Sequence, residues 1–225
     1  MLFGKIDYLN LLPFHVFLKS YPLQSYIKKS VEFKKGVPSK LCKDLEFRRV
    51  DAAVISSIES RKSKYKTLDF GICSKKDVKS VLIRKNSDKA LDPASMTSNM
   101  LCKVLGLKGE VIIGDRALKA YLDEGENAFY DMGRIWHEKR NLPFVFGRFS
   151  YIKNKNSYEK LIKKFLKTKV KIPKYIVDQY SKSRNVKSKD ILWYLGFISY
   201  KMDKKEKKSL KIFLNLAREF KFDPK

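Results

Sequence analysis

The sequence has few residues of the kinds that bind metals, form disulfides or span membranes. Its 225 residues include two histidines and three cysteines, and Cys42, Cys73 and Cys102 stand far apart with no CxxC pair. We therefore expect buried thiols, no disulfide and no metal site. Charged residues interrupt every apolar run well before membrane-spanning length, and Asp7 falls where a signal peptide would have its apolar core. These patterns predict a cytoplasmic protein without a membrane segment.

Acidic residues are also scarce, since 24 Asp and Glu stand against 50 Lys and Arg, a formal net charge of +26. An excess of this size would suit a nucleic-acid-binding protein. Lysine predominates, however, and is spread over the whole chain, with no Arg-rich arm, zinc-finger spacing or RNP-like aromatic motif. We interpret it as lysine on solvated helix faces that also helps attract an anionic substrate, and expect no nucleic-acid partner. The hydrophobic content of 44% suffices for one large domain or two small lobes.

Polar residues follow two of the short apolar runs that are predicted to be strands. Residues 2–8 lead to Asn10 at the start of a helix, and residues 50–55 end on Ser56 and Ser57. In open α/β sheets ligands bind beyond the carboxyl ends of the strands, so these three polar residues are candidate contacts. For Asn10 a plain helix cap is an equally good interpretation.

A helix is predicted to start within residues 95–98, where hydroxyl residues give way to an apolar run at helical spacing. The start of a helix presents unpaired N–H groups and the positive end of the helix dipole, which bind a carboxylate without a basic side chain. Thr97 and Ser98 are therefore candidate binding residues. An ordinary capped helix is the simpler interpretation of this stretch taken alone.

A second turn of interest follows a short apolar strand at residues 111–113. Gly114 permits a tight turn, and Asp115 is predicted to begin the next helix. Two interpretations of Asp115 stay open: a helix cap that also ties a hinge, or a hydrogen-bond acceptor or proton carrier that faces a cleft.

Residues 78–84 and 142–149 are predicted to be strands that carry the chain from one lobe to the other and back. Asp131 is predicted to cap a helix between them. From residue 154 onward the apolar residues, Ile198 included, follow helical spacing, which predicts a run of packing helices. Nothing in these helices suggests chemistry.

Seven short motifs, taken in order, are similar to those of one family. They are Asn-Leu-Leu-Pro at 10–13, Asp-Ala-Ala-Val-Ile-Ser-Ser at 51–57, Ser-Val at 80–81, Thr-Ser at 97–98, Ile-Gly-Asp-Arg-Ala-Leu at 113–118, Tyr-Asp-Met-Gly-Arg-Ile-Trp at 130–136 and Leu-Pro-Phe-Val-Phe at 142–146. Each is weak alone, but the ordered set is specific. Between residue 4 and about residue 149 the chain resembles the chorismate dehydratases of the futalosine route to menaquinone, the MqnA family.

This resemblance implies an α/β, two-lobed type 2 periplasmic-binding-protein-like fold, with a ligand cleft between the lobes and a helical C-terminal segment. Residues 1–81 would form the first part of lobe I, residues 82–142 lobe II, and residues 143–225 the return to lobe I with the C-terminal helices. The implied reaction converts chorismate, a dicarboxylate, to 3-[(1-carboxyvinyl)oxy]benzoate and water with no metal or organic cofactor. The oligomeric state stays open between monomer and homodimer.

The resemblance also implies roles for the candidate residues, which both lobes would supply: Asn10, Ser56, Ser57, Thr97, Ser98, Gly114 and Asp115. The helix start would bind one carboxylate, and a serine of the first lobe would bind the other carboxylate or a hydroxyl. Asn10 would orient the reacting face. Because an amide cannot act as a general base, either Asp115 or a carboxylate of the substrate itself would take the proton.

The sequence departs from the family pattern beside the expected cleft. Asn99 stands where a further serine is common, and Gly147 and Phe149 replace the usual Ala and Trp. Two alternatives therefore stay open: the related naphthoate-forming MqnD family of the same pathway, and a non-catalytic small-anion-binding protein of the same fold. The Ile-Gly-Asp-Arg-Ala-Leu and Tyr-Asp-Met-Gly motifs favour the dehydratase. The sequence assigns no role to three further polar residues, His15, His137 and Arg148.

Overall fold

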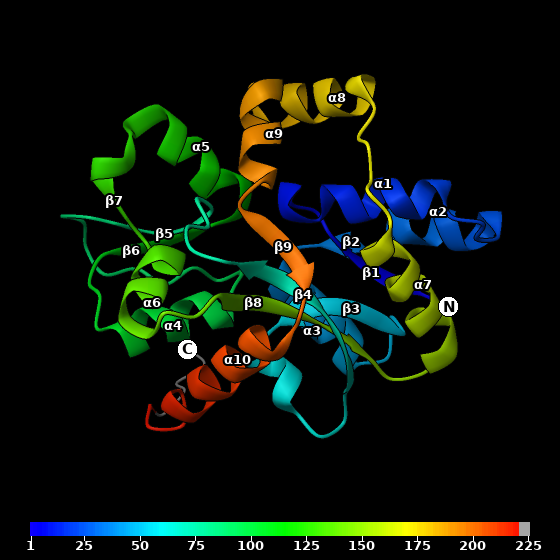
Figure 1. Cartoon of the computed structure of the whole chain (residues 1–225), viewed down its shortest axis with the longest axis horizontal. Coiled ribbons are helices and arrows are strands. Elements are labelled where there is room, and N and C mark those ends of the chain that lie inside the picture. Colours follow the sequence, from blue (N-terminus) through cyan, green and yellow to red (C-terminus); the bar gives the residue numbers. More distant parts are fainter. Residues whose placement is uncertain (221–225) are drawn as a thin grey trace.

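The structure, a computed structural model, describes residues 1–220 and contains two sheets with helices around them (Figure 1). The larger sheet consists of β1 (Phe3–Ile6), β2 (Lys35–Gly36), β3 (Ala52–Ser56), β4 (Lys66–Ser74), β8 (Phe144–Tyr151) and β9 (Ile198–Lys201) in the order β2-β1-β3-β8-β4-β9. The strands β2, β1 and β3 are parallel, and the remaining pairs are antiparallel. All residues of β1 and β3 are buried, as is typical of parallel strands that are covered on both faces.

The first lobe also contains helices, some of which pack on the two faces of the larger sheet. They are η1 (Leu9–Leu11), α1 (Leu12–Ser20), α2 (Ser25–Phe33), α3 (Pro38–Glu46), η2 (Glu59–Arg61), α7 (Lys155–Lys167), α8 (Lys174–Arg184), α9 (Ser188–Leu195) and α10 (Lys204–Leu216). On one face, Phe14 of α1 and Phe165 of α7 pack against Phe70 of β4, with ring centroids 5.0 and 5.6 Å away. On the other face, α3 contacts β1 and β3. This packing places the carboxyl ends of β1 and β3 at one edge of the sheet.

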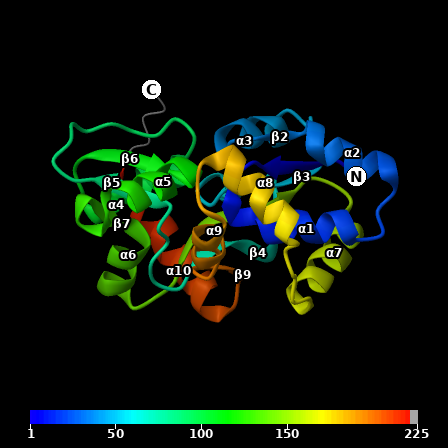
Figure 2. The same ribbon diagram turned by 90° about the horizontal axis from the view of Figure 1, so that it is seen from above.

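The smaller sheet consists of β5 (Val81–Arg84), β6 (Glu110–Ile113) and β7 (Phe129–Asp131), all antiparallel, in the order β6-β5-β7. Its helices are α4 (Met96–Leu105), α5 (Gly114–Glu124), η3 (Glu126–Ala128) and α6 (Met132–Arg140). Seen from above, this part lies beside the part built on the larger sheet (Figure 2). The fold is therefore two-lobed, as the sequence predicts, with the first lobe built on the larger sheet and the second on the smaller.

The helix starts predicted within residues 95–98 and at Asp131 are confirmed, and each has a capping side chain. The Ser95 hydroxyl accepts the Ser98 N–H at 3.2 Å at the start of α4. Asp131 caps α6, and a capping box of Asp203 and Glu206 opens α10. Each of these caps satisfies N–H groups that the first helical turn leaves unpaired.

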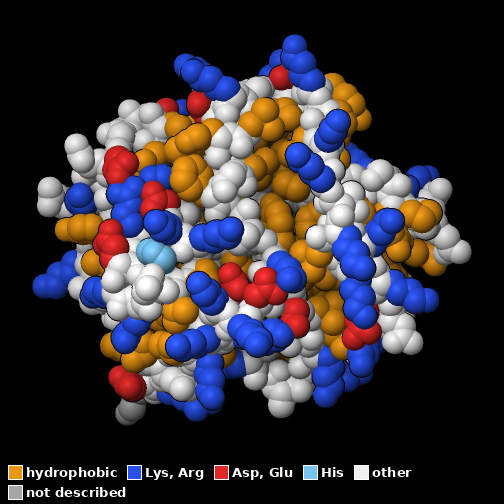
Figure 3. Space-filling model, in the orientation of Figure 1, with side chains coloured by type: hydrophobic (Ala, Val, Ile, Leu, Met, Phe, Trp, Pro, Cys, Tyr) orange, Lys and Arg blue, Asp and Glu red, His pale blue; other side chains and the backbone are white. Residues whose placement is uncertain are grey.

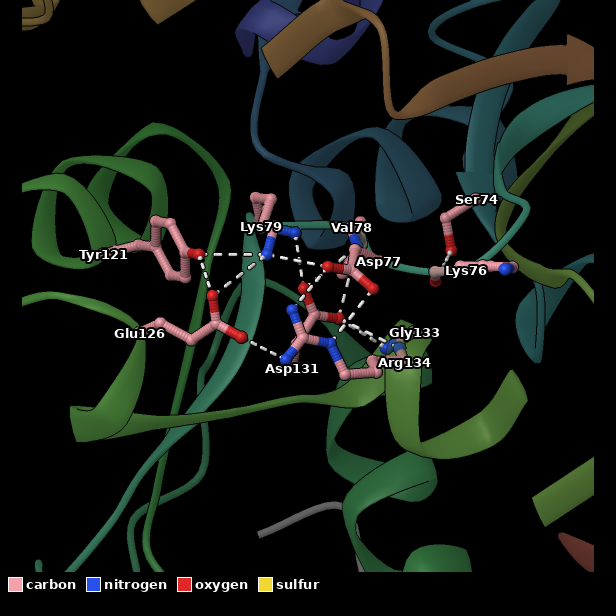
Figure 4. A network of polar contacts seen from close by, with 10 residues as sticks. All are labelled: Ser74, Lys76, Asp77, Val78, Lys79, Tyr121, Glu126, Asp131, Gly133 and Arg134. Carbon is pink, nitrogen blue, oxygen red and sulfur yellow. Dashed lines mark hydrogen bonds and ion pairs between the residues drawn. The ribbon is translucent and has the colours of Figure 1, made fainter. Parts of the chain in front are cut away.

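The predicted strand at residues 78–84 is shorter in the structure, because β5 begins only at Val81. The Asp131 carboxylate accepts the N–H groups of Val78 and Lys79 at 3.0 and 2.9 Å, and Lys79 has φ +59° (Figure 4). These two residues therefore lie in a loop that bends at Lys79, and no described strand pairs with them. The crossing from the first lobe to the second is a loop fixed by a side chain.

The prediction of an all-helical segment after residue 154 was wrong at one element. Helix α9 ends at Leu195, and Ile198 begins β9, the edge strand beside β4. A buried isoleucine at the end of an apolar pattern fits both helical and strand spacing. Strand β9 pairs with residues more than 120 positions earlier, and local spacing cannot reveal such a partner. Helix α10 also contacts both β8 and α4, so the C-terminal segment touches both lobes.

On the face shown in Figure 3 the Lys and Arg side chains are scattered among apolar and acidic ones. Lys160, Lys163, Lys164 and Lys167 all lie exposed on α7, opposite the buried Leu161 and other apolar side chains of that helix. Within residues 1–220, no helix is long and apolar enough to cross a bilayer.

Candidate functional site

A narrow cavity of about 40 Å³ lies between the two lobes, at the carboxyl ends of β1 and β3 and the first turns of α4 and α5. Its polar lining consists of Tyr8, Asn10, Ser56, Ser80, Ser95 and Ser98. Its apolar lining includes Ile6, Ile55, Ile72, Val81, Ile113 and Phe146. Of the ionisable residue types, tyrosine alone occurs among the described lining residues, so a charged ligand here would meet hydroxyls, amides and backbone.

The structure brings most of the predicted site residues to this cavity. Asn10, Ser56, Ser98 and Gly114 line it. Ser57 and Thr97 are fully buried in its wall, and Asp115 lies outside the lining.

Asn10 lies in η1, which begins shortly after the end of β1, and it lines the cavity. The Tyr200 hydroxyl donates to its backbone carbonyl at 2.7 Å and fixes the turn from the side of β9. The side-chain oxygen Oδ1 is buried and has no hydrogen-bond partner in the described part of the chain. An unpaired buried polar atom costs free energy, and a ligand that donates to it would recover that cost.

Ser56 and Thr97 join the two lobes across the cavity. Their hydroxyl oxygens are 2.5 Å apart, and the Thr97 N–H donates to Ser56 Oγ at 2.9 Å. Thr97 Oγ1 also accepts the Ile58 N–H at 3.3 Å. If Thr97 donates in the hydroxyl pair, the Ser56 proton is free to reach a ligand. Ser57 turns away, because its hydroxyl donates to the Val145 carbonyl.

The first turn of α4 points its positive end toward the cavity. The hydroxyls of Ser95 and Ser98, which both line the cavity, are 2.8 Å apart. The N–H groups of Thr97 and Ser98 are already paired with side chains, Ser56 and Ser95 respectively. An anion would therefore meet hydroxyls and the helix dipole here before it met free amides.

Tyr8 and Ser80 belong to the lining, and sequence reasoning did not assign either of them. A Cβ atom at Gly114, where φ is +67°, would lie 2.8 Å from the Tyr8 ring, so glycine permits the lobes to meet. Ser80 accepts the Gly114 N–H at 2.8 Å through its carbonyl, and its hydroxyl is 2.8 Å from Tyr194 Oη. Tyr8 stands two residues before Asn10, and that position at a strand end was the available signal.

The phenol of Tyr8 stays protonated at neutral pH. Burial, assisted by the nearby carboxylates of Asp92 and Asp115, raises the pKa of Tyr8 to about 12. It can donate a hydrogen bond into the cavity, and it is a poor proton acceptor.

Asp115 is not the cap of α5, because Ile113 occupies the cap position and makes no side-chain bond. Its Oδ1 atom accepts the Leu9 N–H of the first lobe at 2.9 Å. Its Oδ2 atom lies 2.9 Å from Arg184 Nε, an ion pair whose atoms are not aligned as a hydrogen bond. Burial raises the pKa of the Asp115 carboxyl to about 6, against the opposing effects of Leu9 and Arg184. The carboxylate thus ties the lobes behind the cavity.

The remaining polar residues that the sequence left unassigned lie elsewhere: His15, His137 and Arg148 are absent from the cavity lining. Burial, and next the charge of Lys5, holds the pKa of His15 well below its ordinary value, so this imidazole is neutral. Residues 1–220 contain no group of three or more His, Cys, Asp or Glu side chains that could hold a metal ion.

Solved structures define the class of this fold. A protein from Archaeoglobus fulgidus superposes with a TM-score of 0.69 at 12% identity, covering 96% of each chain. The periplasmic aliphatic sulphonate-binding protein of Escherichia coli superposes with a TM-score of 0.59 at 11% identity, over 97% of this chain and 86% of that one. A Candida albicans protein described as having the generic periplasmic binding protein fold gives 0.56 at 13% identity, over 98% and 90%. The fold is thus periplasmic-binding-protein-like.

Sequence comparison narrows this class to a family. A family model described as menaquinone biosynthesis matches residues 1–110 and 105–219. The curated chorismate dehydratase of Campylobacter jejuni subsp. jejuni serotype O:23/36 (strain 81-176) is 54% identical over 219 residues, which are 97% of this chain and 98% of that protein. The chain belongs to this menaquinone-biosynthesis family, and the resemblance inferred from the seven motifs is confirmed.

Proposed function

We propose that this protein is a chorismate dehydratase, a carbon–oxygen hydro-lyase that converts chorismate to 3-[(1-carboxyvinyl)oxy]benzoate and water. The observation that carries the proposal is the cavity between the lobes, whose lining combines Asn10, with its unpaired amide oxygen, and several hydroxyl side chains. The 54% identity to a curated chorismate dehydratase over nearly the whole chain supports it.

A dianionic substrate would be held without a basic side chain in the lining. Ser95 and Ser98, at the positive end of α4, would donate to one carboxylate, and Ser56 would donate to the second carboxylate or to the ring hydroxyl. Thr97 and Ser57 would act from the wall, where their hydrogen bonds fix Ser56 and β8. Neutral donors of this kind hold an anion in a fixed orientation.

The reaction breaks a C–H bond and a C–O bond at two adjacent ring carbons and makes the ring aromatic. The proton leaves the ring carbon that bears the enolpyruvyl ether, the hydroxyl leaves the adjacent carbon, and the electron pair of the C–H bond becomes the new ring double bond. The group that takes the proton passes it to the departing hydroxide, so one water is released and the acceptor returns to its starting state. Asn10 Oδ1 would accept a hydrogen bond from the ring hydroxyl of bound chorismate and so hold the ring face in register with the proton acceptor.

The proton acceptor in this scheme is a carboxylate of the substrate. The described lining residues include no Asp, Glu, His or Lys, and Tyr8, with its pKa raised to about 12, stays protonated. Asp115 lies behind the cavity, with one oxygen occupied by the Leu9 N–H and the other beside Arg184. A water-poor cavity raises the basicity of the bound carboxylate.

The first experiment mixes the purified protein with chorismate, without added metal, and follows the diene absorbance and the product mass. Loss of one water together with an aromatic spectrum is the expected result. Binding without turnover would favour a non-catalytic anion-binding protein. An absence of both binding and turnover would exclude the dehydratase and direct attention to the naphthoate-forming alternative.

Variants then test the residue roles. Asn10→Ala should lower kcat by about 100-fold, the usual effect of losing one oriented polar contact, while the exposed Asn156→Ala on α7 should leave it unchanged. Asp115→Asn should lower kcat by about 10-fold, because asparagine keeps an oxygen for the Leu9 N–H but loses the charge beside Arg184. Complete loss of turnover in Asp115→Asn, with substrate affinity intact, would instead assign the proton transfer to a protein base.

We also infer that the lobe boundaries lie near residues 81 and 143. All three strands of the smaller sheet fall within residues 81–131, and the strands on either side of that range belong to the larger sheet. Cleavage by a low concentration of protease should occur first in loops inside one lobe or at these two crossings, and preferential cleavage within β5 or β8 would contradict the boundaries.

A further inference from the structure

Arg184, the last residue of α8, lies behind the candidate site and contacts acidic groups from two distant parts of the chain. Its Nη2 atom is 3.0 Å from Asp7 Oδ1 and donates to the Asp7 carbonyl at 3.2 Å. Its Nε atom is 2.9 Å from Asp115 Oδ2. The guanidinium carbon also lies 5.9 Å from the centre of the Tyr180 ring on the same helix. One side chain of the C-terminal segment thus joins both lobes.

The two acidic residues frame the turn that carries Asn10. Asp7 lies between the end of β1 and Tyr8. The Asp115 carboxylate accepts the N–H of Leu9, the first residue of η1. The contacts therefore form a chain in space from Arg184 to Asp115 to Leu9, and Asn10 is the next residue. None of Arg184, Asp7 and Asp115 belongs to the cavity lining.

We propose that Arg184 is a positioning residue for the reaction, which holds the Asp115 carboxylate on the Leu9 amide and thereby fixes η1 with Asn10 facing the substrate. This role rests on the proposed dehydratase function. It also gives the C-terminal helices a part in catalysis, although they supply no residue to the cavity lining.

The arrangement differs from an ordinary surface ion pair, which water screens and which contributes little. The Asp115 side chain is 13% exposed and the Arg184 side chain 26%. Within residues 1–220, Arg184 is the one cation at ion-pair distance from Asp115, and it also separates Asp115 from a second carboxylate, that of Asp7. Without the guanidinium, two acidic groups would face each other across η1, and the Leu9 contact would lose its support.

The titratable groups around Asp115 make the arrangement measurable. Asp7 and Tyr8 approach from the segment before η1, Arg184 from α8 and Tyr194 from α9. Burial raises the pKa of Asp115 to about 6, Arg184 opposes this rise, and Asp7 adds to it. The wild-type protein should therefore lose kcat/KM as the pH falls through about 6, because the protonated carboxyl accepts the Leu9 N–H less strongly and no longer attracts Arg184.

The test compares Arg184→Gln with Lys182→Gln, an exposed cation of the same helix. Arg184→Gln should lower kcat by about 10-fold with a smaller change in KM, because a misplaced contact weakens catalysis more than binding. Its acid limb should move to higher pH. In Asp7→Asn the acid limb should move to lower pH, so the two variants shift it in opposite directions. Lys182→Gln should behave as wild type.

Hydrogen exchange supplies a readout that needs no turnover. The Leu9 amide should exchange about 10-fold faster in Arg184→Gln than in wild type, and should be unchanged in Lys182→Gln. Unchanged Leu9 exchange and an unmoved acid limb in Arg184→Gln would overturn the proposal. If Arg184→Gln does not fold, Asp7→Asn decides alone, and an unmoved limb there counts against it. A wild-type protein without dehydratase activity would refute the proposed function, and Leu9 exchange would still decide whether Arg184 holds Asp115.

Discussion

Two acidic side chains near the starts of neighbouring helices in the second lobe are held in different ways. Asp131 accepts hydrogen bonds from four backbone N–H groups, those of Val78, Lys79, Gly133 and Arg134, in the crossing loop and the first turn of α6 (Figure 4). Asp115 accepts one backbone N–H, from the opposite lobe, and has Arg184 beside its other oxygen. Burial raises the pKa of both carboxyls, and backbone donors oppose the rise in both cases.

The difference teaches what each acid does. A carboxylate whose oxygens are satisfied by nearby backbone fixes local structure, and its loss is felt as lost stability. A carboxylate that accepts an N–H of the other lobe fixes the position of one lobe relative to the other. Its loss therefore disturbs the site that lies between the lobes. Asp131 therefore stabilises the crossing loop from the first lobe to the second, which we call the hinge. Asp115 instead fixes the positions of the residues around the cavity.

The largest expected effect is that of Asp131→Ala on stability. Four N–H groups lose their acceptor at about 1 kcal/mol each, so the free energy of unfolding should fall by about 4 kcal/mol. Urea unfolding measures it, with the exposed, surface-paired Asp123→Ala as the control. A loss below about 1 kcal/mol would mean that water replaces the carboxylate and that the hinge does not depend on it.

Gly114→Ala should be the next largest. A left-handed φ of +67° and a Cβ 2.8 Å from the Tyr8 ring together should cost about 3 kcal/mol and push Asp115 away from Leu9. Gly106→Ala is the matched control, since its φ is +68° but nothing lies within 4 Å of the added Cβ, and it should cost about 1 kcal/mol. Equal losses in the two variants would show that the lobes separate freely at Gly114.

Sequence reasoning recovered the parts of this site that depend on local pattern. Asn10, Ser56 and Ser98 were found because each follows a buried strand or opens a helix, and Asp131 because a capping residue has a local signature. Tyr8, whose contact with the other lobe has no local signature, was not assigned. The Tyr8 ring matters because Gly114 packs on it across the cavity, a contact between residues more than 100 positions apart.

The same limit explains the errors in the fold. The strand at Val81 was drawn three residues too long because the acceptor of the Val78 and Lys79 N–H groups stands more than 50 positions later. Strand β9 was taken as helix because its partner strand lies in the first third of the chain. Asp115 fitted two local interpretations equally, and only the position of Leu9 in space distinguishes a tie between lobes from a group facing the ligand.

Asp115→Asn should alter the pH dependence of stability by a smaller amount. Its pKa is about 6 in the folded protein against the ordinary 3.8, so the folded state binds a proton more tightly, and wild-type stability should fall as the pH rises from about 4 to about 6. The asparagine variant lacks this fall. From pH 4 to pH 7 the wild-type free energy of unfolding should decline, relative to the variant, by on the order of 2 kcal/mol.

The comparison with Asp115→Asn isolates one carboxyl, because Asp131 is present in both proteins and its effect cancels. Urea unfolding at several pH values measures the difference, and Asp123→Asn is the exposed control. A difference that stays constant from pH 4 to pH 7 would show that Asp115 is well solvated in the folded protein, and the tie to Leu9 would then be too weak to position η1.

Arg134→Met gives the smallest expected effect and compares the two arginines beside these acids. The Arg134 guanidinium donates to both carboxylate oxygens of Asp77, at 3.0 and 2.6 Å, and also contacts Glu126. The Arg134 side chain is 35% exposed, however, so solvent screens these ion pairs. The free energy of unfolding should fall by about 1 kcal/mol, with kcat, KM and the Leu9 exchange rate unchanged. Arg134→Lys, which keeps the charge and loses the fork, should lie between. Arg134 stabilises the hinge, whereas Arg184 stabilises the turn before Asn10. A loss of kcat in Arg134→Met as large as that in Arg184→Gln would therefore mean that the hinge and the cavity are coupled. Asp131 and Asp115 would then have the same role in catalysis.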